Sequence, residues 1–190
     1  MHAADGILVT GVYGAGKSSV VEELAEMLER HHLAYLALDL DWLRWFHVPG
    51  QPAADAQRTY LANVAAVVGH AVDAGVSHVV AAMAVRDRDE VDELARAMGV
   101  SLRVARLDVP RDEIIRRLEA SPTTGRGDDL VIALEWLDGS IGHGAEDRCV
   151  RNDRPVRETA AEILDWLGWT RGLSTDPPAG SPAEPRTPGR

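Results

Sequence analysis

The segment Gly11–Ser18, which reads GVYGAGKS, constrains the fold of this 190-residue chain more than any other feature. It fits the pattern G-x-x-x-x-G-K-[ST] at every fixed position, follows the short apolar run Ile7–Thr10 and opens an amphipathic stretch. In such a loop the backbone N–H groups converge on phosphate oxygens, and the following helix adds positive potential at its first turn. The sequence therefore predicts a strand, a phosphate-binding loop and a helix in succession.

The residues of this loop have expected roles in binding a nucleotide. Lys17 would place a compact ammonium group between the β- and γ-phosphates, and Ser18 would offer its hydroxyl to Mg²⁺, supported by Ser19. Lys17 is also the single lysine among 20 basic residues, and the planar fork of arginine does not reproduce its point charge. We therefore expect ATP and Mg²⁺ as cofactors. The predicted nucleotide-binding residues of the loop are Gly11, Gly14, Ala15, Gly16, Lys17, Ser18 and Ser19.

Apolar runs alternate with amphipathic stretches along the rest of the chain. Further buried strands are predicted at Leu33–Leu38, Ser77–Val85, Leu102–Leu107 and Cys149–Val150. Helices are predicted at the amphipathic stretches Ser18–Arg30, Ala54–Ala74, Asp89–Met98, Arg111–Glu119 and Pro155–Leu167. In the first of these, apolar residues recur at three- and four-residue steps, which is the helical period. Strands that alternate with helices favour right-handed crossovers, so we expect an α/β fold with a parallel sheet covered on both faces.

Two segments interrupt this alternation. Ser121–Asp129 reads SPTTGRGDD and is polar, so we expect a lid over about residues 120–130. The last 18 residues, 173–190, hold five of the ten prolines and few apolar residues. Such a segment cannot bury enough surface to offset its ordering entropy. We therefore expect one domain over residues 1–172 and a disordered tail over 173–190.

Composition excludes several classes of function. The net charge of −10 argues against non-specific binding to nucleic acid, and no apolar run approaches the ~18 residues of a membrane-spanning helix. The first residues lack the basic and apolar blocks of a signal peptide, and Cys149 is the single cysteine, so a cytoplasmic location is expected. We expect a small-molecule partner, with no nucleic acid and no membrane. The oligomeric state stays open, with a homodimer as one option.

The second predicted strand ends in LALDLDWLRWF, which brings Asp39, Asp41 and Arg44 to the ligand-facing edge of a parallel sheet. Two carboxylates beside a triphosphate are costly unless a cation or a substrate hydroxyl accompanies them. We expect Asp39 to bind Mg²⁺ or a water, Asp41 to orient and deprotonate an acceptor hydroxyl, and Arg44 to hold an anionic part of the acceptor. The alternative is that both aspartates only end the strand and cap the next helix.

The loop together with the D-x-D-x-x-R motif of residues 39–44 resembles the P-loop small-molecule kinases, with adenylylsulfate kinase the nearest pattern and gluconate and shikimate kinases less similar. The resemblance implies a P-loop NTPase three-layer sandwich, with a five-stranded parallel sheet, an arginine-bearing lid, and an aspartate pair that contacts metal and acceptor. Residues 73–91 are similar to the third strand and following turn of adenylylsulfate kinases, which places Arg86 and Arg88 near the acceptor. The lid sequence of that family is absent, so a different acceptor pocket is expected.

Arginines near the lid and residues after the fifth strand complete the predicted site. Arg117 precedes the polar loop and Arg126 lies within it, and one arginine near the migrating phosphoryl group can contribute ~10³ or more in rate. The alternative for both is a solvated surface. Related kinases seat the adenine on a loop after the fifth strand, which implies roles for Arg151, Asn152 and Pro155. The aromatic residues of WLRWFH (42–47) either line an acceptor pocket or pack a short helix.

These observations favour a kinase that transfers the γ-phosphoryl group of ATP to a hydroxyl of a small molecule. Its predicted catalytic residues are Lys17, Asp41, Arg117 and Arg126, its substrate-binding residues Asp39, Asp41, Arg44 and Arg86, and its metal ligands Ser18 and Asp39. The alternative is a nucleotide-binding regulator that hydrolyses its nucleotide slowly and has no acceptor. The sequence contains no acidic Walker B strand and no N-K-x-D motif, which argues against the regulator.

Overall fold

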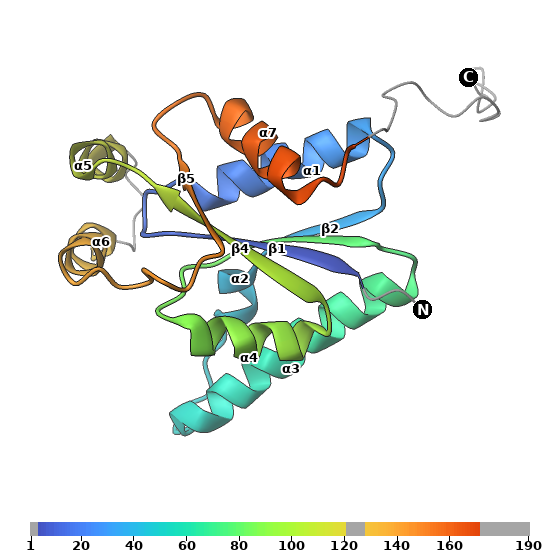
Figure 1. Ribbon diagram of the computed structural model, residues 1–190. Coiled ribbons are helices and arrows are strands. Elements are labelled where there is room, and N and C mark those ends of the chain that lie inside the picture. The colour runs from blue at the N-terminus through green and yellow to red at the C-terminus, as the bar shows by residue number, and fades with distance from the viewer. Residues whose placement is uncertain (1–3, 121–127, 172–190) are drawn as a thin grey trace, which may run out of the picture.

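Five parallel strands form the centre of the molecule, in the order β2-β3-β1-β4-β5 (Figure 1). The structure is a computed structural model, and it describes residues 4–120 and 128–171, to which these statements refer. The strands are β1 (Asp5–Thr10), β2 (Tyr35–Asp39), β3 (His78–Ala82), β4 (Ser101–Asp108) and β5 (Arg148–Arg151). In this order β2 and β5 are the edge strands, and β1, the strand before the phosphate loop, is the middle one.

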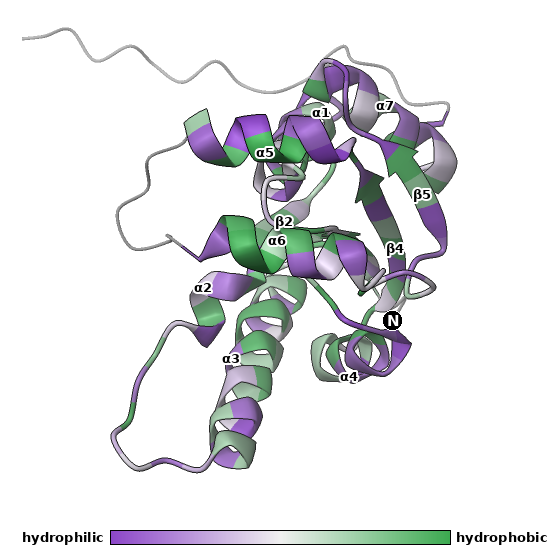
Figure 2. Cartoon of the chain, turned by 90° about the vertical axis from the view of Figure 1, so that its left-hand side faces the viewer, coloured by the Kyte–Doolittle hydropathy of each residue, from purple (hydrophilic) through white to green (hydrophobic). Residues whose placement is uncertain are grey.

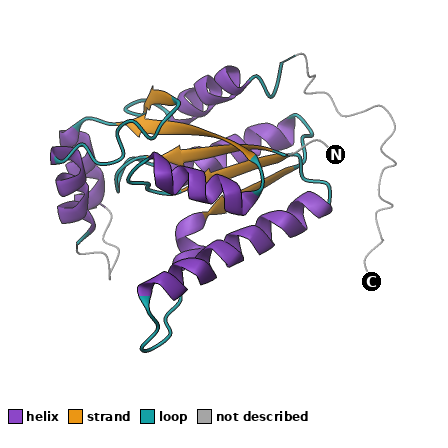
Figure 3. Cartoon of the chain, turned by 60° about the horizontal axis from the view of Figure 1, so that its bottom comes forward, coloured by secondary structure: helices purple, strands orange, loops and turns teal. Residues whose placement is uncertain are grey.

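Helices cover both faces of this sheet (Figures 1 and 3). On one face lie α1 (Lys17–Arg30) and α7 (Val156–Leu167), and on the other α3 (Ala53–Asp73) and α4 (Arg88–Met98). Three helices lie at the end where the strands finish, namely α2 (Leu40–Arg44), α5 (Arg111–Ala120) and α6 (Asp129–Asp138). Figure 2 looks onto this end and shows α2, α5 and α6 around it, with the loop between α2 and α3 extending away. The layers therefore leave the carboxyl ends of the strands as the place for a site.

The core lies in two layers that meet at β1. Ile7 and Val9 pack with residues of α1 and α7, whereas Leu8 packs with residues of α3 and α4. All three side chains are fully buried, as expected for a strand whose successive residues point to opposite faces of a covered sheet. The central strand thus joins both halves of the core immediately before the phosphate loop begins.

The predicted α/β fold with a five-stranded parallel sheet is confirmed, with changes at the element boundaries. The helix α6 was not predicted, because its apolar residues do not sort onto one face: Val131 is 55% exposed, while Ala133 is fully buried. The strand β2 begins at Tyr35 and includes Asp39, and β3 ends at Ala82, three residues before the predicted end.

The predicted lid falls largely on residues 121–127, which lie outside the described residues, as does the predicted tail. At the edges of the predicted lid, Ala120 is the last residue of α5 and Asp129 the first of α6, where an acidic side chain suits the helix N-terminus. Among the residues that the structure describes, no helix combines the length and apolar character that crossing a bilayer requires.

Candidate nucleotide and acceptor site

The loop between β1 and α1 has the backbone geometry of a tight anion cradle. Gly11, Gly14 and Gly16 have φ angles of 140°, 79° and 89°, which residues with a Cβ rarely adopt. A Cβ on Gly16 would lie 2.8 Å from the Asn152 Nδ2 atom, and one on Gly14 would lie 2.9 Å from Leu118 Cγ. The glycines are therefore required both by the turn and by the side chains that pack against it.

Lys17, the first residue of α1, folds back over this loop. Its ammonium group donates to the carbonyl oxygens of Gly11 and Val12, both at 3.1 Å, and lies 5.2 Å from the centre of the Tyr13 ring. The structure thus places the single lysine of the chain at the centre of the cradle, where the sequence predicted it. Ser18 and Ser19 follow in the first turn of α1, and both are exposed.

The cradle is in direct contact with the end of β2. The Ser18 hydroxyl donates to Asp39 Oδ2 at 2.8 Å, and Asp39 Oδ1 accepts the backbone N–H of Asp41 at 3.0 Å. Asp39 therefore caps α2, as the structural alternative proposed, and also touches the loop serine, as the functional interpretation requires.

A hydroxyl and a carboxylate are the hard oxygen ligands that Mg²⁺ prefers. Within the described residues, no group of three or more His, Cys, Asp and Glu side chains could hold a metal ion alone. Ser18 and Asp39 fit a magnesium ion that takes its remaining ligands from phosphate and water, as Mg²⁺ does in nucleotide sites.

Two side chains from distant segments bind the carbonyl groups of the cradle. Asn152, which is 4% exposed, donates from Nδ2 to the Ala15 carbonyl at 2.7 Å. Arg117 donates to the carbonyls of Gly14 and Ala15, both at 3.4 Å, and to that of Asn152 at 2.7 Å. Arg117 was predicted at the end of a helix, just before the lid, and it lies there on α5, where its side chain binds the phosphate loop.

Glu113, one turn earlier on α5, holds this arginine in place. Its Oε1 accepts from Arg117 Nε at 2.7 Å, and the same carboxylate accepts from Arg116 at 2.6 and 2.7 Å. Hydrogen bonds from Arg116 and then from Arg117 lower the pKa of Glu113 from 4.5 to about 2. Sequence reasoning missed Glu113, although its spacing of three and four residues from two arginines was a usable signal.

The remaining predicted nucleotide residues lie just beyond β5. Arg151 is the last residue of β5, is 69% exposed and pairs with Asp153, whose pKa it lowers. Pro155 precedes α7 as its N-cap residue. Arg126, the predicted lid arginine, lies outside the described residues.

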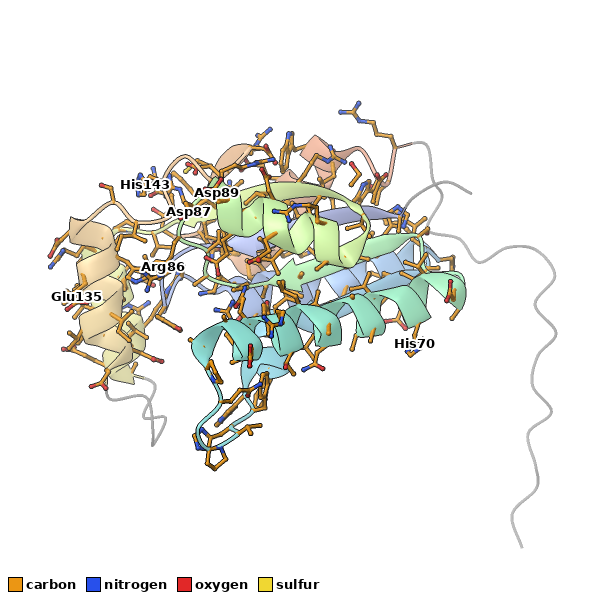
Figure 4. All side chains as sticks on the ribbon, turned by 90° about the horizontal axis from the view of Figure 1, so that it is seen from below. His70, Arg86, Asp87, Asp89, Glu135 and His143 are labelled. Atoms are coloured by element: carbon orange, nitrogen blue, oxygen red, sulfur yellow. The ribbon has the colours of Figure 1, made fainter. Side chains whose placement is uncertain are left out.

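The predicted acceptor residues lie at the ends of β2 and β3. Asp41 is in the first turn of α2, and Arg44 ends that helix with its guanidinium 4.4 Å from the centre of the Tyr60 ring. Arg86 follows β3, and its guanidinium lies 5.7 Å from the centre of the Trp136 ring on α6. Figure 4 shows Arg86 close to α6. The structure therefore brings an acidic and two basic candidates to the same edge of the sheet as the cradle.

The aromatic residues after Asp41 do not fill this region. Trp42 and Trp45 are 63% and 74% exposed, with their ring centres 5.1 Å apart. Trp42 borders an open groove of about 530 Å³ that also contains Ser18 and Asp39. Phe46 packs against the core on the α3 side, in agreement with the predicted helix packing, whereas Trp42 lines this groove; a role in binding an acceptor stays a prediction.

A smaller cavity of about 160 Å³ lies on the other side of the cradle. It is bordered by Gly11 and Val12, by the end of β4, and by Trp136 of α6. His143, in the segment after α6, also borders it. The phosphate loop therefore has open space on both sides, with the groove toward β2 and the cavity toward β4.

Comparisons with known proteins agree with this geometry. A family profile described as AAA domain (AAA_33) matches residues 7–133. No curated protein sequence gives a significant match. The structure is similar to a sugar kinase from Janibacter sp. HTCC2649, with a TM-score of 0.63 and 20% identity over 87% of this chain and 95% of that one. It is also similar to a gluconokinase from Sinorhizobium meliloti 1021, with a TM-score of 0.58 and 23% identity over 88% and 94%.

An APS kinase from Mycobacterium tuberculosis, determined with AMPPNP and APS, has a TM-score of 0.52 and 23% identity over 88% of this chain and 99% of that one. At these identities the likeness shows the fold. The predicted resemblance to P-loop small-molecule kinases is confirmed for the fold, and the profile shows the family, since it covers more than half of the chain and begins in the strand before the cradle. The chain thus belongs to the AAA-domain family AAA_33 and has the P-loop fold shared by these kinases.

Proposed function

We propose that the protein is an ATP- and Mg²⁺-dependent kinase that transfers the γ-phosphoryl group to a hydroxyl of a small molecule. The hydrogen bond of 2.8 Å between Ser18 and Asp39 carries this proposal. It joins the phosphate loop to the segment that holds Asp41, so the groups suited to a triphosphate and those suited to an acceptor are neighbours. Phosphoryl transfer depends mainly on such positioning and on charge stabilisation.

The nucleotide would lie along the cradle. Its phosphate oxygens would accept hydrogen bonds from backbone N–H groups of residues 11–19 and from the Lys17 ammonium group. Arg151 and Pro155 would border the adenine. Ser18 and Asp39 would hold Mg²⁺, which when bound neutralises part of the triphosphate charge. Arg117 would contribute by keeping the loop carbonyls fixed, since it donates to those of Gly14 and Ala15.

The acceptor would lie at the ends of β2 and β3. Asp41 would orient its hydroxyl and take the proton, as the acceptor oxygen bonds to the γ-phosphorus and the bond from that phosphorus to the β–γ bridging oxygen breaks. Arg44 and Arg86 would lie beside the acceptor, and Arg126 is proposed to approach the phosphoryl group from the lid. ADP and a phosphorylated small molecule are the products.

The alternative, a regulator without an acceptor, predicts that the tryptophans near Asp41 close the space beside it. The exposure of Trp42 and Trp45 supports the kinase instead. We also propose a cytoplasmic location, and a homodimer stays a prediction.

The decisive experiment incubates the purified protein with labelled ATP, Mg²⁺ and a panel of hydroxyl-bearing metabolites, and then searches for a phosphorylated product by mass. A product that carries the label is expected with one class of acceptor. Slow ATP hydrolysis that no member of the panel stimulates would instead support the regulator.

A further inference from the structure

The first turn of α4 contains a carboxylate, Glu90, that reaches outside its own helix. Asp87 caps α4 by accepting the Glu90 N–H at 3.0 Å, and Glu90 Oε2 accepts the backbone N–H of Arg86, also at 3.0 Å. In the usual capping box, the glutamate accepts from the cap residue itself. Here it reaches one residue further back, so its carboxylate fixes the turn that carries Arg86.

The other oxygen of this carboxylate faces Arg44. Glu90 Oε1 lies 3.5 Å from Arg44 Nη2, and the same nitrogen lies 3.4 Å from Gln57 Oε1. The guanidinium also stacks over the ring of Tyr60, which is 1% exposed. The two charged side chains are 19% and 43% exposed, and pairs of this kind stabilise a fold only slightly. The contact of Glu90 with Arg44 therefore changes the position and the net charge of Arg44 more than it changes the stability of the fold.

Arg86 has a different environment. Among the described residues, no carboxylate pairs with its guanidinium, which lies over Trp136. Its backbone is tied on both sides: its carbonyl accepts the Gly142 N–H at 2.9 Å, and the neighbouring Val85 N–H donates to Thr10 Oγ1 at 3.2 Å. Since Thr10 directly precedes the cradle, Arg86 is held near the phosphate loop while its charge is left available.

We propose that Glu90 determines acceptor specificity, because it neutralises Arg44 and leaves Arg86 to receive a single acidic group. This proposal rests on the kinase function proposed above and adds the substrate class, a hydroxy acid with one carboxylate. A second acidic group directed toward Arg44 would meet the charge of Glu90 and be repelled. Glu90 acts through Arg44 and is thus a positioning residue.

The test measures the affinities of two probes, D-gluconate with one carboxylate and D-glucarate with two, by calorimetry on the full chain. The wild type is expected to prefer gluconate. Glu90→Gln should shift the ratio of the two dissociation constants by about fivefold or more toward glucarate, because Arg44 regains a free charge. Adding Arg44→Gln to Glu90→Gln should return the ratio to the wild-type value, which a role confined to capping α4 would not do.

Asp92→Asn is the matched control, since it removes one acidic charge from the exposed surface of the same helix, where Asp92 pairs with Arg88. Its ratio should equal that of the wild type. An unchanged ratio in Glu90→Gln, a shift that persists in the double variant, or binding of neither probe to any of the four proteins would overturn the proposal. A shifted ratio without any phosphoryl transfer would refute the kinase function while leaving the role of Glu90 intact.

Discussion

The proposed nucleotide side of the site is held by hydrogen bonds from within the molecule, whereas the proposed acceptor side is exposed to solvent. On the nucleotide side, the buried Asn152 and the half-buried Arg117 both donate to the Ala15 carbonyl. On the acceptor side, Trp42 and Trp45 lie largely in solvent, and the guanidinium of Arg86 lies against an aromatic ring. For the proposed kinase, a rigid loop would suit the nucleotide, and an open surface would suit an acceptor that differs from one related enzyme to another.

Removal of the ammonium group of Lys17 should have the largest effect on phosphoryl transfer. Lys17→Ala is expected to lower phosphoryl transfer by about 10³-fold or more, because it removes the point charge at the β- and γ-phosphates. Lys17→Arg should fail to restore activity, since its planar fork cannot occupy the same place. Steady-state transfer rates check both, and an active Lys17→Ala protein would show that the cradle is not catalytic.

The acceptor side can be disabled separately from the cradle. Asp41→Asn is expected to reduce transfer by about 10²–10³-fold, because the amide cannot take the proton of the acceptor hydroxyl. Calorimetry with Mg²⁺ and a non-hydrolysable ATP analogue should give the wild-type affinity. Wild-type transfer in this variant would remove Asp41 from the mechanism, whereas loss of nucleotide binding would show that the two sides are not independent.

The hydrogen bond from Asn152 to the phosphate loop can be tested by removing the Asn152 side chain. In Asn152→Ala the Ala15 carbonyl loses a buried hydrogen bond, and this loss is expected to lower the affinity for the proposed nucleotide about tenfold. Asn63→Ala is the matched control, because Asn63 binds a carbonyl of the acceptor side, that of Leu43 at 3.4 Å. Equal nucleotide affinities for the two variants would contradict a special role of Asn152 in the cradle.

The smallest expected effect is a pH dependence of stability that comes from Glu113, which accepts a hydrogen bond from Arg117. Because the folded protein lowers the pKa of Glu113 from 4.5 to about 2, its ionised form stabilises the fold above pH 4.5, and this contribution is lost as the pH falls toward about 2. The difference in melting temperature between wild type and Glu113→Gln should therefore shrink over this range. Glu119→Gln, on the exposed end of the same helix, serves as control, and a difference that does not change with pH would contradict the role of ionised Glu113.

Features that depend on neighbouring residues could be predicted from the sequence. The spacing of the loop glycines and Lys17 predicted the cradle, and the end of an apolar run predicted Asp39 at the carboxyl end of β2. Interactions across the sequence could not be predicted: Asn152 binds a carbonyl 137 positions away, and Arg44 meets Glu90 46 positions away. The hydrogen bonds of Arg117 to the phosphate loop could not be predicted for the same reason, because the two carbonyls that it binds are more than 100 positions away.

The central strand has a consequence for how such a protein can change. Ile7 and Val9 pack into the core on one face of the sheet, and Leu8 packs into the core on the other face. A register shift of one residue in β1 would turn each of these side chains to the wrong face. The packing of β1 therefore fixes the position at which the cradle begins. The segment from Trp45 to Pro52 lies between α2 and α3, and within it Phe46 packs against the core on one side of the sheet only. Insertions there could change the surface beside the proposed acceptor site, while the phosphate loop would keep its position in the sheet.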